Sequence, residues 1–118
     1  MTKTTKKDFE LFKKECKKFI DLFELNNWSI VFEHSNKKGM LASCVTDISS
    51  YRTVISFCKK WDDSIEKMTK SSIVKLALHE VLHLLLARMS DYGNSRFLNR
   101  DELIEAEEEL VNKLINIL

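Results

Sequence analysis

Residues 77–89, ALHEVLHLLLARM, decide the fold of this chain, because an almost wholly apolar segment here holds two of the three histidines in the sequence. If residues 73–89 form a helix, apolar side chains occupy nearly all sides of it: Ile73, Val74, Leu76, Ala77, Leu78, Val81, Leu82, Leu84, Leu85 and Leu86. A helix that is apolar on nearly all sides must be buried on several of them. The stretch therefore predicts a central helix that ends near Met89.

Three polar residues, His79, Glu80 and His83, interrupt this apolar helix. Side chains four residues apart lie on one helical face, with Cβ atoms about 5–6 Å apart, so both imidazoles can bind one metal ion. Glu80 is about 100° round the helix from His79, near enough to reach a water on that ion. This is the H-E-x-x-H arrangement of two ligands and a general base. A single buried histidine is more often part of a hydrogen-bonded core, but two of three histidines sharing this motif favour a metal site.

A catalytic zinc ion takes three protein ligands and leaves one position open. The extended motif H-E-x-x-H-x-x-G-x-x-H cannot supply the third, because Leu86 and Met89 occupy its glycine and histidine positions. The acidic stretch IEAEEELVNKL at 104–114 is the best source, since its acids share the helix with a buried stripe. Glu108 aligns with the apolar positions Ile104, Val111 and Ile115. Glu107 aligns nearly as well, with Leu103, Leu110 and Leu114. An inward carboxylate needs a cation or a hydrogen-bond partner, so either glutamate qualifies.

The remaining patterns predict an α+β fold. Apolar residues spaced by three and four predict an N-terminal helix from Asp8 to about Leu25. The alternating segment 28–34, WSIVFEH, predicts a strand, and two more strands are expected at 41–48 and 51–58. We expect these three strands to form an antiparallel sheet with one face covered by helices. A last helix is predicted from Arg100 to Ile117.

Capping patterns give the expected helix starts. The central helix has three candidate starts: the Asp63–Glu66 pair, Thr69 and Ser71. Residues 90–100, SDYGNSRFLNR, are expected to form a loop, and Asn99 with Glu102 then opens the last helix.

Composition indicates a single globular domain over residues 1–118, with 44% hydrophobic and 31% charged residues. A net charge of +1 argues against bulk nucleic acid as a partner. Cys16, Cys44 and Cys58 have no CxxC spacing, so we expect them to be small core residues. No apolar run is long enough to cross a membrane, and no signal peptide is apparent. These features favour a cytoplasmic protein.

The segment ALHEVLHLLL, followed by EEELVNKL at 107–114, resembles the minimal zincin-like metallopeptidases of phages, prophages and other mobile elements. The layout is similar to that of ImmA/IrrE-type and SprT-like zinc peptidase domains. In ImmA/IrrE-type proteins the third ligand is a glutamate in the pattern E-x-x-A-N-x-F-A, which Glu108, Val111, Asn112 and Leu114 match loosely. SprT-like domains use a third histidine, which this chain lacks, and the N-E-x-x-S-D helix of thermolysin-type enzymes is also absent.

The resemblance implies a zincin-like fold and a Zn²⁺ ion held by His79, His83 and Glu108. It implies a peptidase in which Glu80 accepts a proton from the attacking water and passes it to the leaving amine. An extended peptide or protein substrate would pair with an exposed sheet edge. Tyr92, in the loop expected after the central helix, is the candidate donor to the oxyanion, ahead of His34 and Tyr51.

Two other functions compete with the peptidase. One is a catalytically inactive, zinc-stabilised protein-interaction module of a phage or mobile element. The other is a nucleic-acid-associated protein that uses the basic segment 1–20, which holds seven lysines and three acidic residues. The absence of a recognised nucleic-acid motif ranks this last reading lowest.

Overall fold

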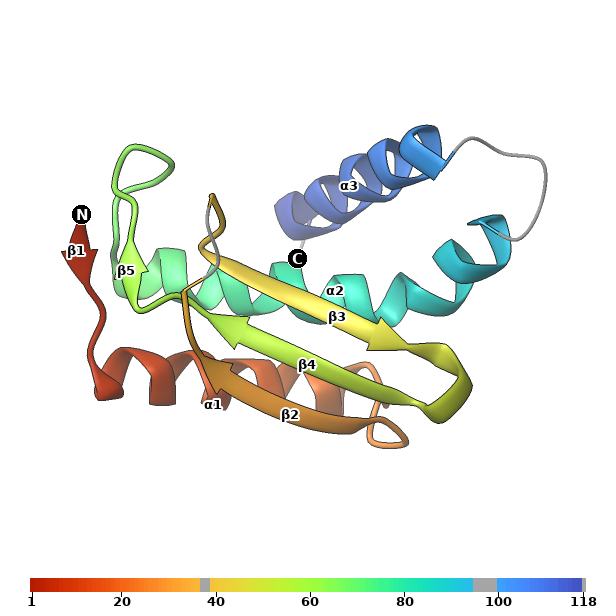
Figure 1. Ribbon diagram of the computed structural model, residues 1–118, viewed down its shortest axis with the longest axis horizontal. Helices are drawn as coiled ribbons and strands as arrows, with labels where there is room; N and C mark the ends of the chain where they lie inside the picture. Colours follow the sequence, from red (N-terminus) through yellow and green to blue (C-terminus); the bar gives the residue numbers. More distant parts are fainter. Residues whose placement is uncertain (37–38, 95–99, 118) are drawn as a thin grey trace.

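The computed structural model describes residues 1–36, 39–94 and 100–117, and its elements follow the predicted order of helix, strands, helix and helix (Figure 1). The helices are α1 (Lys6–Leu22), α2 (Lys70–Asn94) and α3 (Arg100–Ile117), and the short 3₁₀ helix η1 covers Ile48–Ser50. The strands are β1 (Thr2–Lys3), β2 (Ser29–His34), β3 (Ala42–Asp47), β4 (Arg52–Phe57) and β5 (Lys60–Trp61). The fold is α+β, as predicted.

The main sheet has the order β2-β4-β3 and is mixed. β3 and β4 form an antiparallel hairpin through η1, in which Asp47 lies opposite Arg52. β2 runs parallel to β4, with Ser29 opposite the same Arg52, so the predicted antiparallel sheet is wrong for this pair. The physical reason is the strand order, in which β4 lies between β2 and β3. The strands β2 and β3 point in opposite directions and β3 is antiparallel to β4, so β2 is parallel to β4. A separate antiparallel pair, β1 with β5, was not predicted.

Helices α1 and α2 lie on one face of this sheet (Figure 1), and no other described element covers its opposite face. Phe32, Ile55 and Cys44 sit side by side in register, and all three belong to the core between sheet and helices. On the opposite face Val31 and Val45 flank β4 and are 58% and 55% exposed. The expectation of a sheet covered on one side is confirmed.

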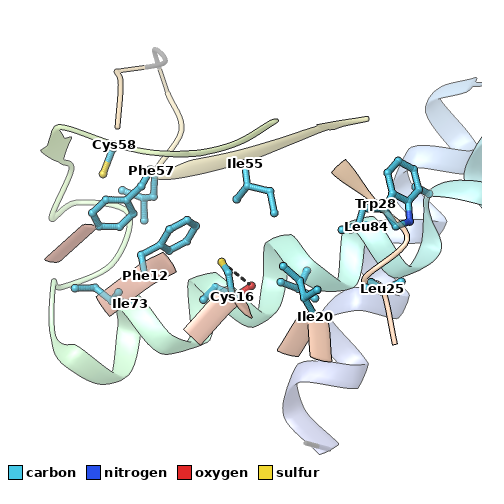
Figure 2. Packing of buried hydrophobic residues seen from close by; sticks show 14 of the residues in the cluster. Phe12, Cys16, Ile20, Leu25, Trp28, Ile55, Phe57, Cys58, Ile73 and Leu84 are labelled. Carbon is cyan, nitrogen blue, oxygen red and sulfur yellow. Dashed lines mark hydrogen bonds between the residues drawn. The ribbon is translucent and has the colours of Figure 1, made fainter. Parts of the chain in front are cut away.

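The N-terminal helix α1 packs its apolar stripe against α2 and the sheet (Figure 2). A capping box starts the helix: the backbone N–H of Asp8 donates to Thr5 Oγ1 at 3.1 Å, and the Thr5 N–H donates to the Asp8 carboxylate at 2.8 Å. The helix ends at Leu22, before the predicted Leu25, because the backbone turns left-handed at Glu24 with φ of 56°.

The central helix α2 begins at one of the three predicted caps. The Ser72 N–H donates to Thr69 Oγ1 at 3.0 Å, and the Thr69 N–H donates to the Ser72 hydroxyl at 2.7 Å. The other predictions for this start are wrong: the Asp63–Glu66 segment is a turn, and Ser71 lies inside the helix.

At its other end α2 continues to Asn94, so the residues from Ser90 to Asn94, which we predicted as loop, are helical. A glycine inside a helix costs only about 1 kcal/mol, so Gly93 does not have to end α2. A contact between Ser90 and Glu107 of α3 also joins this last part of α2 to the neighbouring helix.

The C-terminal helix α3 packs against α2 around Leu78, Leu82 and Val111, all of which are buried. Ile104 is 41% exposed, so the predicted buried stripe of α3 is wrong at this residue. The side chains of Leu103 and Leu110, which also align with this stripe, lie outside the described part of the chain. With α1, α3 and β3 all contacting it, α2 is the central helix that its apolar sequence predicted. Within the described ranges, no helix is both long and apolar enough to cross a membrane.

Candidate metal centre

Helix α2 places the two histidines together, as their spacing predicted. The imidazole rings of His79 and His83 have centroids 4.8 Å apart, and their Nε2 atoms are separated by 3.1 Å. Their side chains are 26% and 19% exposed, so both are partly accessible from outside the core. Two ring nitrogens this close can bind one cation together.

Helix α3 brings the Glu108 carboxylate to the same point. Its Oε1 lies 2.6 Å from His83 Nε2, and its Oε2 lies 3.6 Å from His79 Nε2. The side chain is 42% exposed, which leaves it open to solvent on one side. The three residues predicted to be metal ligands therefore have their donor atoms gathered in one place.

The neighbouring Glu107 contacts a different atom of the same ring. Its Oε1 lies 3.4 Å from His83 Nδ1, and its Oε2 accepts a hydrogen bond from the Ser90 hydroxyl at 3.2 Å. Its side chain is only 11% exposed, so Glu107 is more buried than Glu108. Adjacent glutamates thus face the two different nitrogens of His83.

Glu80 lies beside the histidines and is almost fully buried, with 4% of its surface exposed. One oxygen of its carboxylate and the ligand nitrogens of His79 and His83 all lie within 4.8 Å of one another. Burial raises the pKa of Glu80 to about 7; His83 lowers that pKa and the Glu108 carboxylate raises it. Burial also lowers the pKa of His79, and the proximity of His83 adds to this effect, which favours the neutral imidazole that a metal binds.

The donor atoms suit a divalent cation. Bonds of about 2.0–2.1 Å in a tetrahedral site separate neighbouring donors by roughly 3.3 Å. His79 Nε2 and His83 Nε2 are 3.1 Å apart, close to that value. The Glu108 carboxylate lies 2.6 Å from His83 Nε2 through Oε1 and 3.6 Å from His79 Nε2 through Oε2, so it contacts both rings. Imidazole nitrogen and carboxylate oxygen are both ligands that zinc accepts. His79, Glu80 and His83 therefore form a candidate metal site of the H-E-x-x-H type on α2.

Two cavities flank this centre, one beside each histidine. The first, of about 660 Å³, is lined by His83 and Glu107 and by the part of β3 that ends at Asp47. The second, of about 330 Å³, is lined by His79 and Glu80 and by Ala42 at the start of β3. Residues of β3 line both cavities, and β3 also contacts α2, which carries the two histidines. β3 is an edge strand of the main sheet.

Tyr92, the predicted oxyanion donor, belongs to the last turns of α2 and not to a loop, so that part of the prediction is wrong. The helix passes beyond Met89 before the chain leaves it. The Tyr92 side chain lies outside the described part of the structure, and its role stays a prediction.

The two weaker oxyanion candidates contact residues outside the centre. His34 ends β2, on the edge of the sheet away from β3, and its Nε2 lies 2.8 Å from the Thr4 hydroxyl. Tyr51 follows η1, with its ring edge-on to Trp28 at 5.2 Å. Their contacts are those of structural residues.

Ser90 is the site residue that sequence reasoning missed, because we assigned it to a loop. It follows His83 by two helical turns, so a longer helix prediction would have placed both on one face.

No protein-family model, curated protein or solved structure matches this chain, so the function of the site is inferred from its own geometry. On that geometry, the molecule is an α+β protein with a candidate metal centre between its central and C-terminal helices.

Proposed function

We propose that this protein is a zinc-dependent peptidase with a minimal zincin-like architecture, as its resemblance to phage-type metallopeptidases implies. One observation carries the proposal. His79, His83 and Glu108 direct their donor atoms to one point, and the buried carboxylate of Glu80 lies beside it. Three protein ligands with a neighbouring acid are the set that a catalytic zinc site requires.

In this proposal His79, His83 and Glu108 hold the ion, and Glu80 is the general base. Zinc, when bound, supplies a Lewis acid and lowers the pKa of a water molecule towards neutrality. Glu80 would accept a proton from the attacking water and would then donate it to the leaving amine. Its burial keeps the carboxyl group away from competing bulk water.

The arrangement around the centre supports a peptide as substrate. Extended peptides commonly bind by adding a strand to an exposed sheet edge, and β3 offers such an edge beside the histidines. Cavities on both sides of the centre leave room for a chain that continues in both directions.

The test is Glu80→Gln, which removes the base and leaves the three ligands in place. We expect the variant to keep the wild-type zinc content by elemental analysis and to lose about 10²–10⁴-fold in cleavage of an unstructured protein. Glu105→Gln, on the exposed side of α3, is the matched control and should cleave normally. His83→Ala should lose the metal itself. A Glu80→Gln variant as active as the wild type would refute the proposed mechanism.

A non-catalytic, zinc-stabilised interaction module is the second candidate. The specific observation in its favour is the attachment of α3, whose buried contacts with α2 centre on Leu78, Leu82 and Val111. A metal ion held by both helices would strengthen that small contact. For such a module, the purified wild-type protein would bind zinc and cleave no peptide in a broad library.

A further inference from the structure

We infer that Glu107 and Ser90 form a supporting layer behind the metal centre that orients His83. In this arrangement Ser90 holds Glu107, and Glu107 accepts the Nδ1 proton of His83. Both are positioning residues, and the inference rests on the proposed metal site.

The geometry assigns the two neighbouring glutamates to different atoms. Glu108 lies against Nε2 of both histidines, at 2.6 and 3.6 Å, whereas Glu107 lies 3.4 Å from Nδ1 of His83. The two nitrogens of an imidazole ring point in different directions. A carboxylate at Nδ1 therefore cannot share the ion that Nε2 binds, so Glu107 is not the third ligand.

The burial of Glu107 supports the same role. A carboxyl group whose side chain is only 11% exposed requires hydrogen-bond partners for its oxygens. One oxygen accepts the Ser90 hydroxyl at 3.2 Å, and the other faces the His83 ring. Both partners belong to α2, so each oxygen of Glu107 has a contact with that helix.

The chemical consequence concerns the tautomer of His83. A neutral imidazole carries its proton on one nitrogen only. With the proton at Nδ1 facing Glu107, the lone pair of Nε2 points to the place where His79 and Glu108 converge. Ligating histidines commonly donate their other N–H to a carboxylate, and removing that partner typically costs 10–100-fold in metal affinity.

The experiment measures zinc affinity by competition with a chromophoric chelator. We expect Glu107→Ala to bind zinc about 10–100-fold more weakly than the wild type. Glu107→Gln should recover part of this loss, because the amide oxygen still accepts the Nδ1 proton. Ser90→Ala should lose less than Glu107→Ala, and the exposed control Glu105→Ala should match the wild type.

Cobalt substitution separates an orienting role from a ligand role. At saturating Co²⁺, Glu107→Ala should keep the wild-type visible absorption bands, because all ligands remain, whereas Glu108→Ala should change them. Wild-type affinity in Glu107→Ala would overturn the inference, and so would a spectrum altered in the same way as that of Glu108→Ala. If Glu107→Ala proves unfolded by circular dichroism, Glu107→Gln takes its place. It should still bind zinc more weakly than the wild type and keep the wild-type cobalt bands, and wild-type affinity in this variant would overturn the inference. A wild-type protein that binds no metal would instead refute the proposed function.

Discussion

At the scale of single residues, burial favours the protonated form of the three cysteine thiols. Cys16 and Cys58 are buried, and Cys44 is half-buried and lines the first cavity. Burial raises the pKa of Cys16 above its ordinary range, that of Cys44 to about 12 and that of Cys58 to about 11. The Thr53 hydroxyl next to Cys44 lowers the pKa of that thiol only in part.

We therefore expect the folded protein to react slowly with a disulfide reagent at pH 8. The thiolate is the reactive form, and a thiol whose pKa lies three units above the pH is ionised only about one time in a thousand. A thiol titration measures this, with the same titration in urea as the control, where all three cysteines should react at the rate of a free thiol. One cysteine reacting at that rate in the folded state would contradict the expectation.

The choice between Glu107 and Glu108 also belongs to this scale. Neighbouring residues on a helix differ by about 100°, so both can lie near the boundary between the buried and the exposed face. The rotation of α3 about its own axis depends on which of its apolar residues pack against α2. Val111 is fully buried and Ile104 is 41% exposed, which no pattern in the sequence of α3 alone could indicate.

At the scale of elements, the N-cap of α2 matters because this helix presents both histidines. Replacing Thr69 by alanine removes the acceptor of the Ser72 N–H and should cost about 1 kcal/mol of unfolding free energy. Urea denaturation measures the loss, and Thr69→Ser, which keeps a hydroxyl, is the matched control. Equal stability of Thr69→Ala and the wild type would mean that the cap contributes nothing.

The strands were predicted in the correct places, because the alternation of apolar side chains is a local property. Their pairing was not, since it depends on which strand is most buried. β4 is the central strand and has buried Thr53 and Ser56 among its apolar residues, so its sequence looks like that of a half-exposed strand. The end of α2 was also predicted wrongly because it depends on a tertiary contact. Ser90, just after the predicted end at Met89, contacts Glu107 of α3.

At the scale of the whole molecule, metal binding should stabilise the fold, because the proposed ligands come from two helices. A ligand that binds only the folded state at 100 times its Kd adds about 2.7 kcal/mol. For a chain of this size we expect a rise in Tm on the order of 10 °C. Differential scanning fluorimetry with added zinc measures it.

The control for this measurement is the double variant His79→Ala/His83→Ala, whose Tm should not respond to zinc. The chelator EDTA should return the wild-type protein to its metal-free Tm. An equal response of the wild type and the double variant would place the stabilising ion elsewhere.

The mixed sheet has a consequence for the order in which the chain folds. Asp47 meets Arg52 across a short turn, whereas Ser29 meets Arg52 only after the whole intervening hairpin has been laid down. Closing a longer loop costs more chain entropy, so we expect the hairpin of β3 and β4 to form before β2 pairs with β4. The strand that borders the histidines is then in place before the far edge of the sheet is added.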